Sequence, residues 1–323
     1  MESRKKVCIL TSGGDAPGMN QCVMAFIKAS ERLGLEPYGA IDGLKGLAEG
    51  NIVKLDRAFA RGLARRAGTV LGTARYPQFV PLEFKKQVAE KLKAQGLTRI
   101  VMLGGDGTQQ AAKGLSQYGI SCLLIPASID NDVKGSEFSL GFFSALNRIV
   151  ESIDSIRDTM ESHSRIFAVQ TMGRECPDLA LYAGVASGAD IVITQADCPP
   201  YEEILERVRA IQKSGQRYCL IVLSEHLIDA QKLVDRLYQD TGWETRLDVL
   251  GHTQRGGSPA AQDRILAQAF GVKAAEVFSE GETSGTIGII GEKIVLSPFD
   301  ADNIRCCAPR STQLVLEAER KAR

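Results

Sequence analysis

Short apolar runs alternate along the chain with longer segments in which apolar residues recur every three or four positions. The short runs predict strands at Val7–Thr11, Glu36–Ile41, Arg99–Leu103, Ser121–Ile125, Ile166–Thr171, Ile191–Thr194, Tyr218–Leu223, Leu247–Leu250 and Thr286–Ile290. The longer segments predict helices at 20–33, 83–95, 108–118, 142–162, 179–187, 201–214, 229–241, 260–279 and 312–322. Continuously apolar strands separated by helices are typical of parallel sheets covered on both faces, so we expect an α/β fold.

The helix predicted at 142–162 has the clearest periodicity. Its apolar positions follow three- and four-residue steps from Phe142 to Met160. A chain of 323 residues has the length of about two domains. We therefore expect this helix to join or underlie two lobes.

Composition narrows the class of protein. Apolar residues make up 44% and charged residues 24%, which is typical of a soluble globular protein. The 39 basic residues balance 39 acidic ones, so the chain lacks the general positive field that attracts nucleic acid or membranes. No apolar run reaches the ~20 residues that span a bilayer, and the first residues do not resemble a signal peptide. We expect a cytoplasmic protein.

The eight cysteines show no C-x-x-C spacing, and the three histidines share no metal-ligand spacing. Cys8, Cys122 and Cys219 lie in apolar, strand-like runs. These positions predict reduced core thiols rather than disulfides or a zinc site.

Two glycine-rich segments each follow a predicted strand and precede a predicted helix. The first reads T-S-G-G-D-A-P-G-M-N at 11–20, and the second reads G-G-D-G-T at 104–108. Glycines allow close approach of the backbone to a ligand, and helix N-termini bind anions. The second segment matches neither the Walker lysine loop nor G-x-G-x-x-G, so it indicates nucleotide phosphates without specifying the enzyme. An ordinary strand–turn–helix junction stays open for the first.

A third segment carries two carboxylates after a buried strand. It reads P-A-S-I-D-N-D-V at 126–133, with Asp130 and Asp132 two residues apart. In an extended segment both would point to the same side, where one could take a proton and the other could order a metal or nearby donors. A capping or turn cluster is the alternative for these residue types.

Several arginines stand beside glycines or short polar residues: Arg75, Arg165, Arg174, Arg246 and Arg255. A guanidinium matches the geometry of a phosphate group. A single arginine of this kind is usually a solvated surface residue. The pattern points to anion recognition only if several of them converge.

Taken together, these segments resemble the ATP-dependent 6-phosphofructokinases of the bacterial type. The matching strings, in order, are T-S-G-G-D-A-P-G-M-N (11–20), G-T-A-R (72–75), G-G-D-G-T (104–108), S-I-D-N-D (128–132), G-F-F-S-A-L (141–146), R-D-T (157–159), M-G-R (172–174), S-E-H (224–226) and V-L-G-H-T-Q-R-G-G-S-P (249–259). Each string is weak alone, but nine in register are specific.

The resemblance implies a fold and domain boundaries. It implies two Rossmann-like three-layer αβα lobes with parallel-rich sheets and an active site in the cleft between them. Residues 1–141 and 254–303 would form the ATP-binding lobe. Residues 142–253 and 304–323 would form the fructose 6-phosphate-binding lobe.

The resemblance also implies roles for single residues. The ATP and magnesium side would comprise Gly14, Arg75, Tyr76, Gly105, Asp106, Gly107 and Thr108, with Asp106 as the Mg²⁺-linked carboxylate. Asp130 would be the base that accepts the proton of the sugar 1-hydroxyl, supported by Asp132. Catalysis would further involve Arg75, Ser128 and Arg174.

The sugar side would comprise Ser128, Met172, Gly173, Arg174 and Glu225, and the clamp on the 6-phosphate would comprise Arg165, Arg246, His252 and Arg255. In the family, the equivalents of Arg165 and Arg246 reach across a subunit interface. A complete site therefore implies a homo-oligomer, usually a tetramer.

The family's phosphoryl donor varies between ATP and pyrophosphate. The pyrophosphate-dependent branch usually carries aspartate where this chain has Gly107, and lysine where it has Ala127. Small neutral residues at both positions leave room for a nucleotide, so ATP is the expected donor. Ser128 replaces the more usual threonine, which keeps the hydroxyl. Ala127 replaces the more usual glycine of the ATP-dependent members, which adds one methyl group.

The family's effector site for ADP or phosphoenolpyruvate is less complete. Candidate residues are Lys28, Arg57, Arg157, Lys213 and Arg217. Lys28 and Met24 stand where arginines are usual, so we expect altered or weaker allosteric control. Losing one phosphate-binding cation costs about 1.5–3 kcal/mol.

Three rival classes are weaker. An NAD or lipid kinase does not explain S-I-D-N-D, and a dinucleotide-binding oxidoreductase would need G-x-G-x-x-G. A non-catalytic regulatory relative would have lost Arg75, Asp106, Asp130 or Arg174, which are all present. Residue types do not exclude tagatose 6-phosphate as an additional acceptor.

Overall fold

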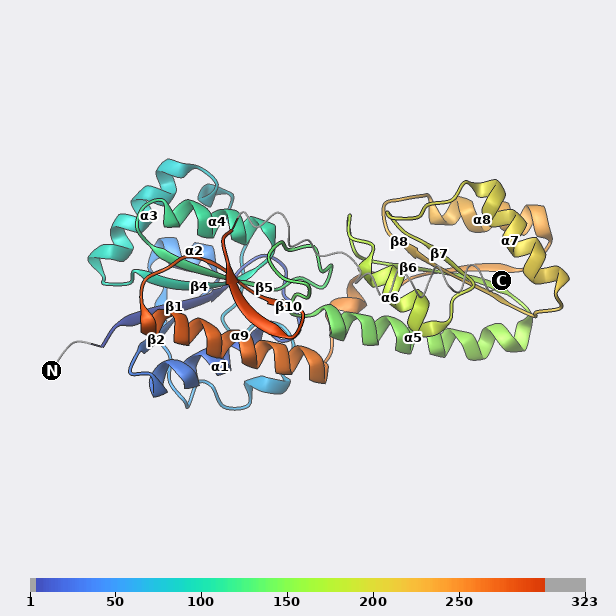
Figure 1. The fold of residues 1–323 in the computed structure, drawn as a ribbon. Coiled ribbons are helices and arrows are strands. Elements are labelled where there is room, and N and C mark those ends of the chain that lie inside the picture. The colour runs from blue at the N-terminus through green and yellow to red at the C-terminus, as the bar shows by residue number, and fades with distance from the viewer. Residues whose placement is uncertain (1–3, 300–323) are drawn as a thin grey trace. The chain divides into compact units, whose positions relative to one another are not determined.

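The computed structural model describes residues 4–299, which form two compact units (Figure 1). Within that range, the first unit holds residues up to Ser144 together with those from Arg255 onward, and the second unit is Ala145–Gln254. The predicted helix at 312–322, Cys306, Cys307 and the lobe assignment of 304–323 lie outside the described residues.

The first unit is built on a seven-stranded sheet in the order β11-β10-β5-β4-β1-β2-β3. Its parallel strands are β1 (Lys6–Thr11), β2 (Glu36–Ala40), β4 (Arg99–Gly104), β5 (Ser121–Pro126) and β10 (Gly285–Ile290). The edge strands β3 (Ile52–Lys54) and β11 (Lys293–Ser297) run antiparallel to their neighbours. The carboxyl ends of β1, β4 and β5 therefore lie side by side.

Helices cover both faces of this sheet (Figure 1). One face carries α1 (Met19–Arg32) and α9 (Ala261–Glu280), and the other carries α2 (Leu44–Glu49), α3 (Leu82–Ala94) and α4 (Asp106–Ser116). Two short 3₁₀ segments, η1 (Leu63–Arg65) and η2 (Pro77–Phe79), lie in the connections. Helices α1 and α9 approach closely because Gly271 has no side chain: a Cβ there would lie 2.6 Å from the carbonyl oxygen of Cys22.

The second unit is built on a four-stranded parallel sheet in the order β7-β8-β6-β9. Its strands are β6 (Ile166–Thr171), β7 (Ile191–Ile193), β8 (Cys219–Ser224) and β9 (Thr245–Val249). Helices α7 (Tyr201–Lys213) and α8 (Ala230–Thr241) pack on one face, where Val208 and Leu237 are buried against the strands. Helix α6 (Asp178–Ser187) and the second-unit part of α5 (Phe142–His163) lie on the other face (Figure 1). The predicted α/β class with parallel-rich sheets is confirmed.

Three elements were not expected from the sequence: α2, β3 and β11. Strand β3 has three residues and strand β11 has five, and neither is a continuous buried run. Helix α2 has only six residues, too few to show a periodicity. Helix α4 also begins earlier than predicted, at Asp106, so the second glycine-rich segment includes the first turn of a helix.

The predicted core thiols are confirmed. Cys8, Cys122 and Cys219 are buried free cysteines. Burial raises the pKa of the Cys8 thiol to about 12. Cys198 is exposed.

The start of α5 is held by a buried carboxylate on α9. Asp263 is 0% exposed; its Oδ1 accepts from the Gly141 backbone N–H at 3.0 Å and its Oδ2 accepts from the Ser144 N–H at 2.7 Å and the Ser144 hydroxyl at 2.5 Å. Burial raises the pKa of Asp263, and these hydrogen bonds oppose that rise. The carboxylate thus supplies an acceptor for donors that the first turn of α5 leaves open.

Candidate active site

The two glycine-rich segments lie together because β1 and β4 are neighbours. The Ser12 N–H donates to the Leu103 carbonyl at 2.8 Å. A Cβ on Gly104 would lie 2.2 Å from the Thr108 hydroxyl and 2.6 Å from the Ser12 carbonyl oxygen. Glycine at 104 is therefore required for the two segments to pack against each other.

The second segment forms an exposed helix N-terminus. Gly105 precedes α4 and provides no side-chain cap, and Asp106 and Gly107 of the first turn are exposed. A Cβ at Gly107 would meet no atom within 4 Å, whereas Thr108 is buried. Backbone N–H groups at such a terminus can bind phosphate oxygens.

The segment before Arg75 is anchored to the first glycine-rich segment. The Thr11 hydroxyl donates to the Gly72 carbonyl at 2.8 Å, and the Thr73 hydroxyl donates to the Gly13 carbonyl at 2.8 Å. Arg75 follows this anchor and is exposed. The ring of Tyr76 packs against Phe84 with ring centroids 6.0 Å apart, so Tyr76 is partly a core residue.

The segment after β5 is a turn rather than an extended strand. The expectation that an extended segment directs Asp130 and Asp132 to the same side is therefore wrong, because the segment is not extended. Asn131, between Asp130 and Asp132, has φ 56°, which reverses the chain locally. Its buried amide holds the turn: Nδ2 donates to the Glu137 carbonyl at 3.1 Å, and Oδ1 accepts from the Ser139 N–H at 2.9 Å. The sequence placed Asn131 in the motif but did not predict this role.

The two carboxylates have different surroundings. Asp130 is 1% exposed, while Asp132 is half-buried and its Oδ1 accepts from the Ser128 hydroxyl at 2.7 Å. Ser128 is further fixed because its carbonyl oxygen accepts from the Ser139 hydroxyl at 2.6 Å. Asp132 thus orients Ser128, and Asp130 is the more enclosed of the two carboxylates.

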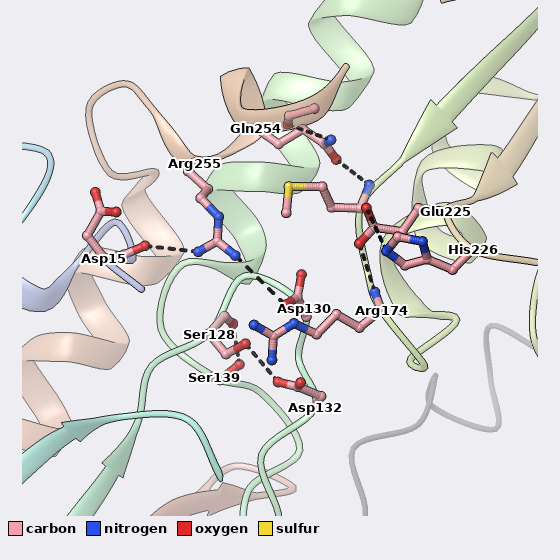
Figure 2. A network of polar contacts seen from close by, with 12 residues as sticks. Asp15, Ser128, Asp130, Asp132, Ser139, Arg174, Glu225, His226, Gln254 and Arg255 are labelled. Carbon is pink, nitrogen blue, oxygen red and sulfur yellow. Dashed lines mark hydrogen bonds and ion pairs between the residues drawn. The ribbon is translucent and has the colours of Figure 1, made fainter. Parts of the chain in front are cut away.

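Arg255 brings the first glycine-rich segment and Asp130 together (Figure 2). Its Nη1 donates to the Asp15 carbonyl at 3.4 Å, and its Nη2 lies 4.0 Å from Asp130 Oδ2. Its side chain is 19% exposed. The first unit therefore places the Arg255 guanidinium beside the buried Asp130 carboxylate and next to the exposed turn that contains Gly14.

In the second unit, Met172, Gly173, Arg174 and Glu225 lie at the carboxyl edge of the sheet. The Glu225 N–H donates to the Thr171 carbonyl at 2.9 Å, and Glu225 Oε1 accepts from the Arg174 N–H at 3.2 Å (Figure 2). Gly173 has φ 140°, and a Cβ there would lie 2.7 Å from the Cys176 carbonyl oxygen. The turn therefore requires glycine, and the structure brings these four predicted residues together.

Gln254 ties this turn to the segment after β9. Its side chain is 0% exposed; Oε1 accepts from the Met172 N–H at 3.1 Å and Nε2 donates to the Gly251 carbonyl at 2.9 Å (Figure 2). His252, in the 3₁₀ segment η3 (Gly251–Arg255), is exposed. Sequence reasoning gave Gln254 no role, although a glutamine inside the G-H-T-Q-R string was a signal.

Arg165 and Arg246 lie at the opposite, amino edge of the same sheet. Arg165 directly precedes β6 and Arg246 is the second residue of β9. Both pair with Glu244: Arg165 Nε donates to Oε2 at 2.7 Å, and an Nη of Arg246 donates to Oε1. The Arg165 guanidinium, mainly by its hydrogen bond, holds the pKa of Glu244 below its usual value. The structure brings these two arginines together at the amino edge, whereas Arg174 and Glu225 lie at the carboxyl edge.

The candidate effector residues form two groups. In the first unit, Arg57 Nε donates to Glu31 at 2.8 Å, and Lys28 is exposed one turn before Glu31 on α1. The second unit holds Arg157, which donates to the Ser187 carbonyl and to the Tyr218 hydroxyl, Arg217, which donates to the Ser164 hydroxyl at 3.1 Å, and the exposed Lys213. Arg57, Arg157 and Arg217 thus already contact groups of this chain.

Comparison with known proteins identifies the family. The family model described as phosphofructokinase matches residues 6–278. The chain belongs to the phosphofructokinase family. Over 291 residues it is 42% identical to the ATP-dependent 6-phosphofructokinase of Photobacterium profundum and 41% identical to that of Vibrio cholerae, covering 90% of this chain and 91% of each relative. The predicted family, enzyme class and activity, phosphorylation of fructose 6-phosphate, are confirmed.

Solved structures agree on the fold. Phosphofructokinase from Saccharomyces cerevisiae superposes with a TM-score of 0.86 and 32% identity, covering 98% of this chain and 46% of that longer chain. The pyrophosphate-dependent phosphofructokinase of Marinobacter aquaeolei superposes with a TM-score of 0.83 at 21% identity, covering 94% of this chain and 86% of that one. The second likeness concerns the fold alone. Among the helices of residues 4–299, none has the length and apolar character to cross a membrane.

Proposed function

We propose that this phosphofructokinase transfers the γ-phosphoryl group of ATP to the 1-hydroxyl of fructose 6-phosphate, giving fructose 1,6-bisphosphate and ADP, with Asp130 as the base. The observation that carries the proposal is the placement of Asp130: a carboxylate 1% exposed, in the turn after β5, 4.0 Å from the Arg255 guanidinium. The ATP-dependent activity named for the bacterial relatives supports it.

Asp130 would accept the proton of the attacking hydroxyl. A base in this position contributes about 10²–10⁴-fold to the rate. Asp132 orients Ser128 through its 2.7 Å hydrogen bond, which supports a role for both in positioning the sugar rather than in proton transfer. Arg75 is the guanidinium group of this unit that would neutralise charge on the transferred phosphoryl group.

The ATP phosphates would bind at the glycine-rich segments. The exposed first turn of α4 and Gly14 present backbone groups, with Gly105 directly before that turn and Thr108 within it. Tyr76 follows Arg75 and would contribute from the adjacent segment. Phosphate oxygens accept hydrogen bonds from backbone N–H groups at a helix N-terminus. The predicted roles of these residues are supported by their grouping around adjacent strand ends.

Mg²⁺ would be held by Asp106 together with the ATP phosphates. Asp106 is exposed in the first turn of α4, and no group of three or more possible metal ligands occurs among residues 4–299. That donor set fits Mg²⁺, which is usually bound through one or two carboxylates and substrate phosphates. When bound, the ion would neutralise phosphate charge.

Two small residues support ATP rather than pyrophosphate as the donor. The space around Gly107 is open, as a nucleotide α-phosphate would require. Ala127 is 2% exposed, with its N–H donating to the Gly104 carbonyl at 3.1 Å. A lysine, which is usual here in the pyrophosphate-dependent branch, would have to be accommodated in this buried position.

The sugar site supports an oligomer. Met172–Arg174 and Glu225 lie at one edge of the second sheet, and Arg165 and Arg246 lie at the other, one six-residue strand away. Six residues of strand span about 20 Å, which a single hexose phosphate does not bridge. Arg165 and Arg246 would therefore serve the site of a second copy, while His252 and Arg255 serve the 6-phosphate in the same chain. A tetramer, an effector site for ADP or phosphoenolpyruvate and a cytoplasmic location remain predictions.

The Asp130→Asn variant tests the proposal. We expect its kcat, measured by coupling product formation to NADH oxidation, to fall about 10²–10⁴-fold while the KM for fructose 6-phosphate changes little. Asp154→Asn makes the same charge change on the exposed face of α5 and should keep full activity. Unchanged turnover in Asp130→Asn would contradict the assignment of the base.

A further inference from the structure

The amino edge of the second sheet presents three charged side chains on one face. Strands β6 and β9 are parallel neighbours in which Phe167 pairs with Arg246. Arg165 lies two residues before Phe167, and Glu244 lies two residues before Arg246, so alternation along the strands directs all three charged side chains to the same face. The Glu244 carbonyl accepts from the Ile166 N–H at 2.8 Å, which joins the two strands at this point.

The Glu244 carboxylate binds both arginines but leaves several of their N–H donors unused. Its Oε2 accepts from Arg165 Nε at 2.7 Å, and its Oε1 accepts from one Nη of Arg246. A guanidinium has five N–H donors. Within residues 4–299, both Nη groups of Arg165 and the remaining donors of Arg246 make no other hydrogen bond or ion pair.

The surroundings of this cluster favour an anion. Arg217 adds a further positive charge nearby: it donates to the Ser164 hydroxyl at 3.1 Å, next to Arg165. Two arginines against one carboxylate leave a net positive charge. The Arg246 side chain is 56% exposed, so its free donors are accessible to a ligand.

We propose that Glu244 is a positioning residue that holds Arg165 and Arg246 as one preformed receptor for the 6-phosphate of substrate bound to a second copy of this chain. The inference rests on the proposed function. An arginine side chain loses rotamer freedom when it binds a ligand, and a carboxylate that orders the side chain beforehand reduces that cost. Glu244 contacts neither the phosphate nor the reacting atoms; it acts through the two arginines.

A competing role for Glu244 would predict the opposite effect on sugar binding. If Glu244 mainly competed with the phosphate for the guanidinium groups, its removal would tighten sugar binding. The free Nη groups of Arg165 argue for positioning, because a phosphate can bind there while the Nε bond to Glu244 stays in place.

The test compares Glu244→Ala and Glu244→Gln with wild type in steady-state kinetics. We expect Glu244→Ala to raise the half-saturating concentration of fructose 6-phosphate about tenfold, with kcat within twofold and the KM for ATP unchanged. Glu244→Gln, which keeps one oxygen acceptor, should lie between. Inorganic phosphate, used as a competitor of fructose 6-phosphate, should bind Glu244→Ala more weakly by a similar factor. Glu202→Ala, which removes an exposed glutamate elsewhere in the second unit, should change none of these values.

A hybrid oligomer tests whether the receptor serves the site of a second copy. Glu244→Ala subunits are co-expressed with Asp130→Asn subunits under two tags and the mixed species is purified. We expect sites with the wild-type half-saturating concentration, because Asp130 comes from one subunit and the intact receptor from the other. A half-saturating concentration that stays at the Glu244→Ala value in the hybrid would overturn the role in a second copy. An unchanged or lower value in Glu244→Ala itself would overturn the positioning role, and wild type without ATP-dependent turnover would instead overturn the proposed function.

Discussion

Gly14 lies directly against the guanidinium group of Arg255. A Cβ built on Gly14 would come within 2.7 Å of Arg255 Nη1, closer than non-bonded atoms approach. The same guanidinium donates to the Asp15 carbonyl and lies 4.0 Å from Asp130 Oδ2. The absence of a side chain at position 14 therefore sets where the positive charge beside Asp130 sits.

Gly14→Ala should lower activity with little effect on folding. The methyl group has to displace the end of a flexible side chain, which costs the fold little, but it moves the guanidinium away from Asp130. Losing a charge-assisted contact is worth about 1.5–3 kcal/mol, so kcat/KM should fall roughly 10- to 100-fold. Steady-state kinetics and urea denaturation measure the two effects.

A double-mutant cycle isolates this relationship. In an Arg255→Ala background, the new methyl group no longer meets a guanidinium, so Gly14→Ala should cause little further loss. Equal losses in both backgrounds would mean that position 14 acts through something other than Arg255.

Gly107→Asp should keep or slightly raise the stability of the fold while it weakens ATP binding. Position 107 is in the first turn of α4 with open space around it, so an aspartate fits and interacts favourably with the helix dipole by about 0.3–1 kcal/mol. The same charge would repel the ATP phosphates, so the KM for ATP should rise at least tenfold. Gly107→Ala is the matched control without charge, and it should bind ATP more tightly than Gly107→Asp. An aspartate variant with the wild-type KM for ATP would argue against phosphate binding at this turn.

Gln254→Ala should weaken sugar binding and also lower the stability of the second unit. Without the buried side chain, the Met172 N–H and the Gly251 carbonyl lose their partner, which costs about 1–3 kcal/mol for an unsatisfied buried group. The turn at Gly173 and Arg174 would lose its anchor, so the half-saturating concentration of fructose 6-phosphate should rise while the KM for ATP stays. Gln216→Ala, which removes an exposed glutamine with two hydrogen bonds, should leave the sugar kinetics unchanged. Equal behaviour of the two variants would contradict a role for Gln254 in the sugar site.

Asp263→Asn should remove a pH-dependent part of the stability. Because burial raises the pKa of Asp263 above its ordinary 3.8, the folded state holds this proton more tightly than the unfolded chain does. The carboxyl group's contribution to the free energy of unfolding is therefore fully present below that ordinary value and is lost as pH rises through the raised pKa. The difference between wild type and Asp263→Asn, from urea denaturation at several pH values, should shrink as pH rises over this window. A difference that grows with pH would show that the hydrogen bonds from Gly141 and Ser144 outweigh burial.

Local pattern was enough to predict the α/β class and nine strands of residues 4–299, since most of these strands carry their own apolar run. It was not enough for β3, β11 and α2, which are short and depend on their neighbours for order. The glycine-rich segments stood out because phosphate sites need glycines near strand ends, whereas the role of Asp130 followed only from the resemblance to the family.

What the sequence by itself determined was the family, together with the candidate site residues that the family's motifs imply. The tertiary structure decided which of them meet: Arg255 with Gly14 and Asp130, and Arg165 with Arg246 at Glu244. It also decided that Asn131 breaks the extended segment and that Gln254 anchors the turn at Met172 and Gly173. The physical reason is that these contacts join residues far apart in the chain, or depend on a backbone angle at one residue, and neither is encoded in the local spacing of residue types.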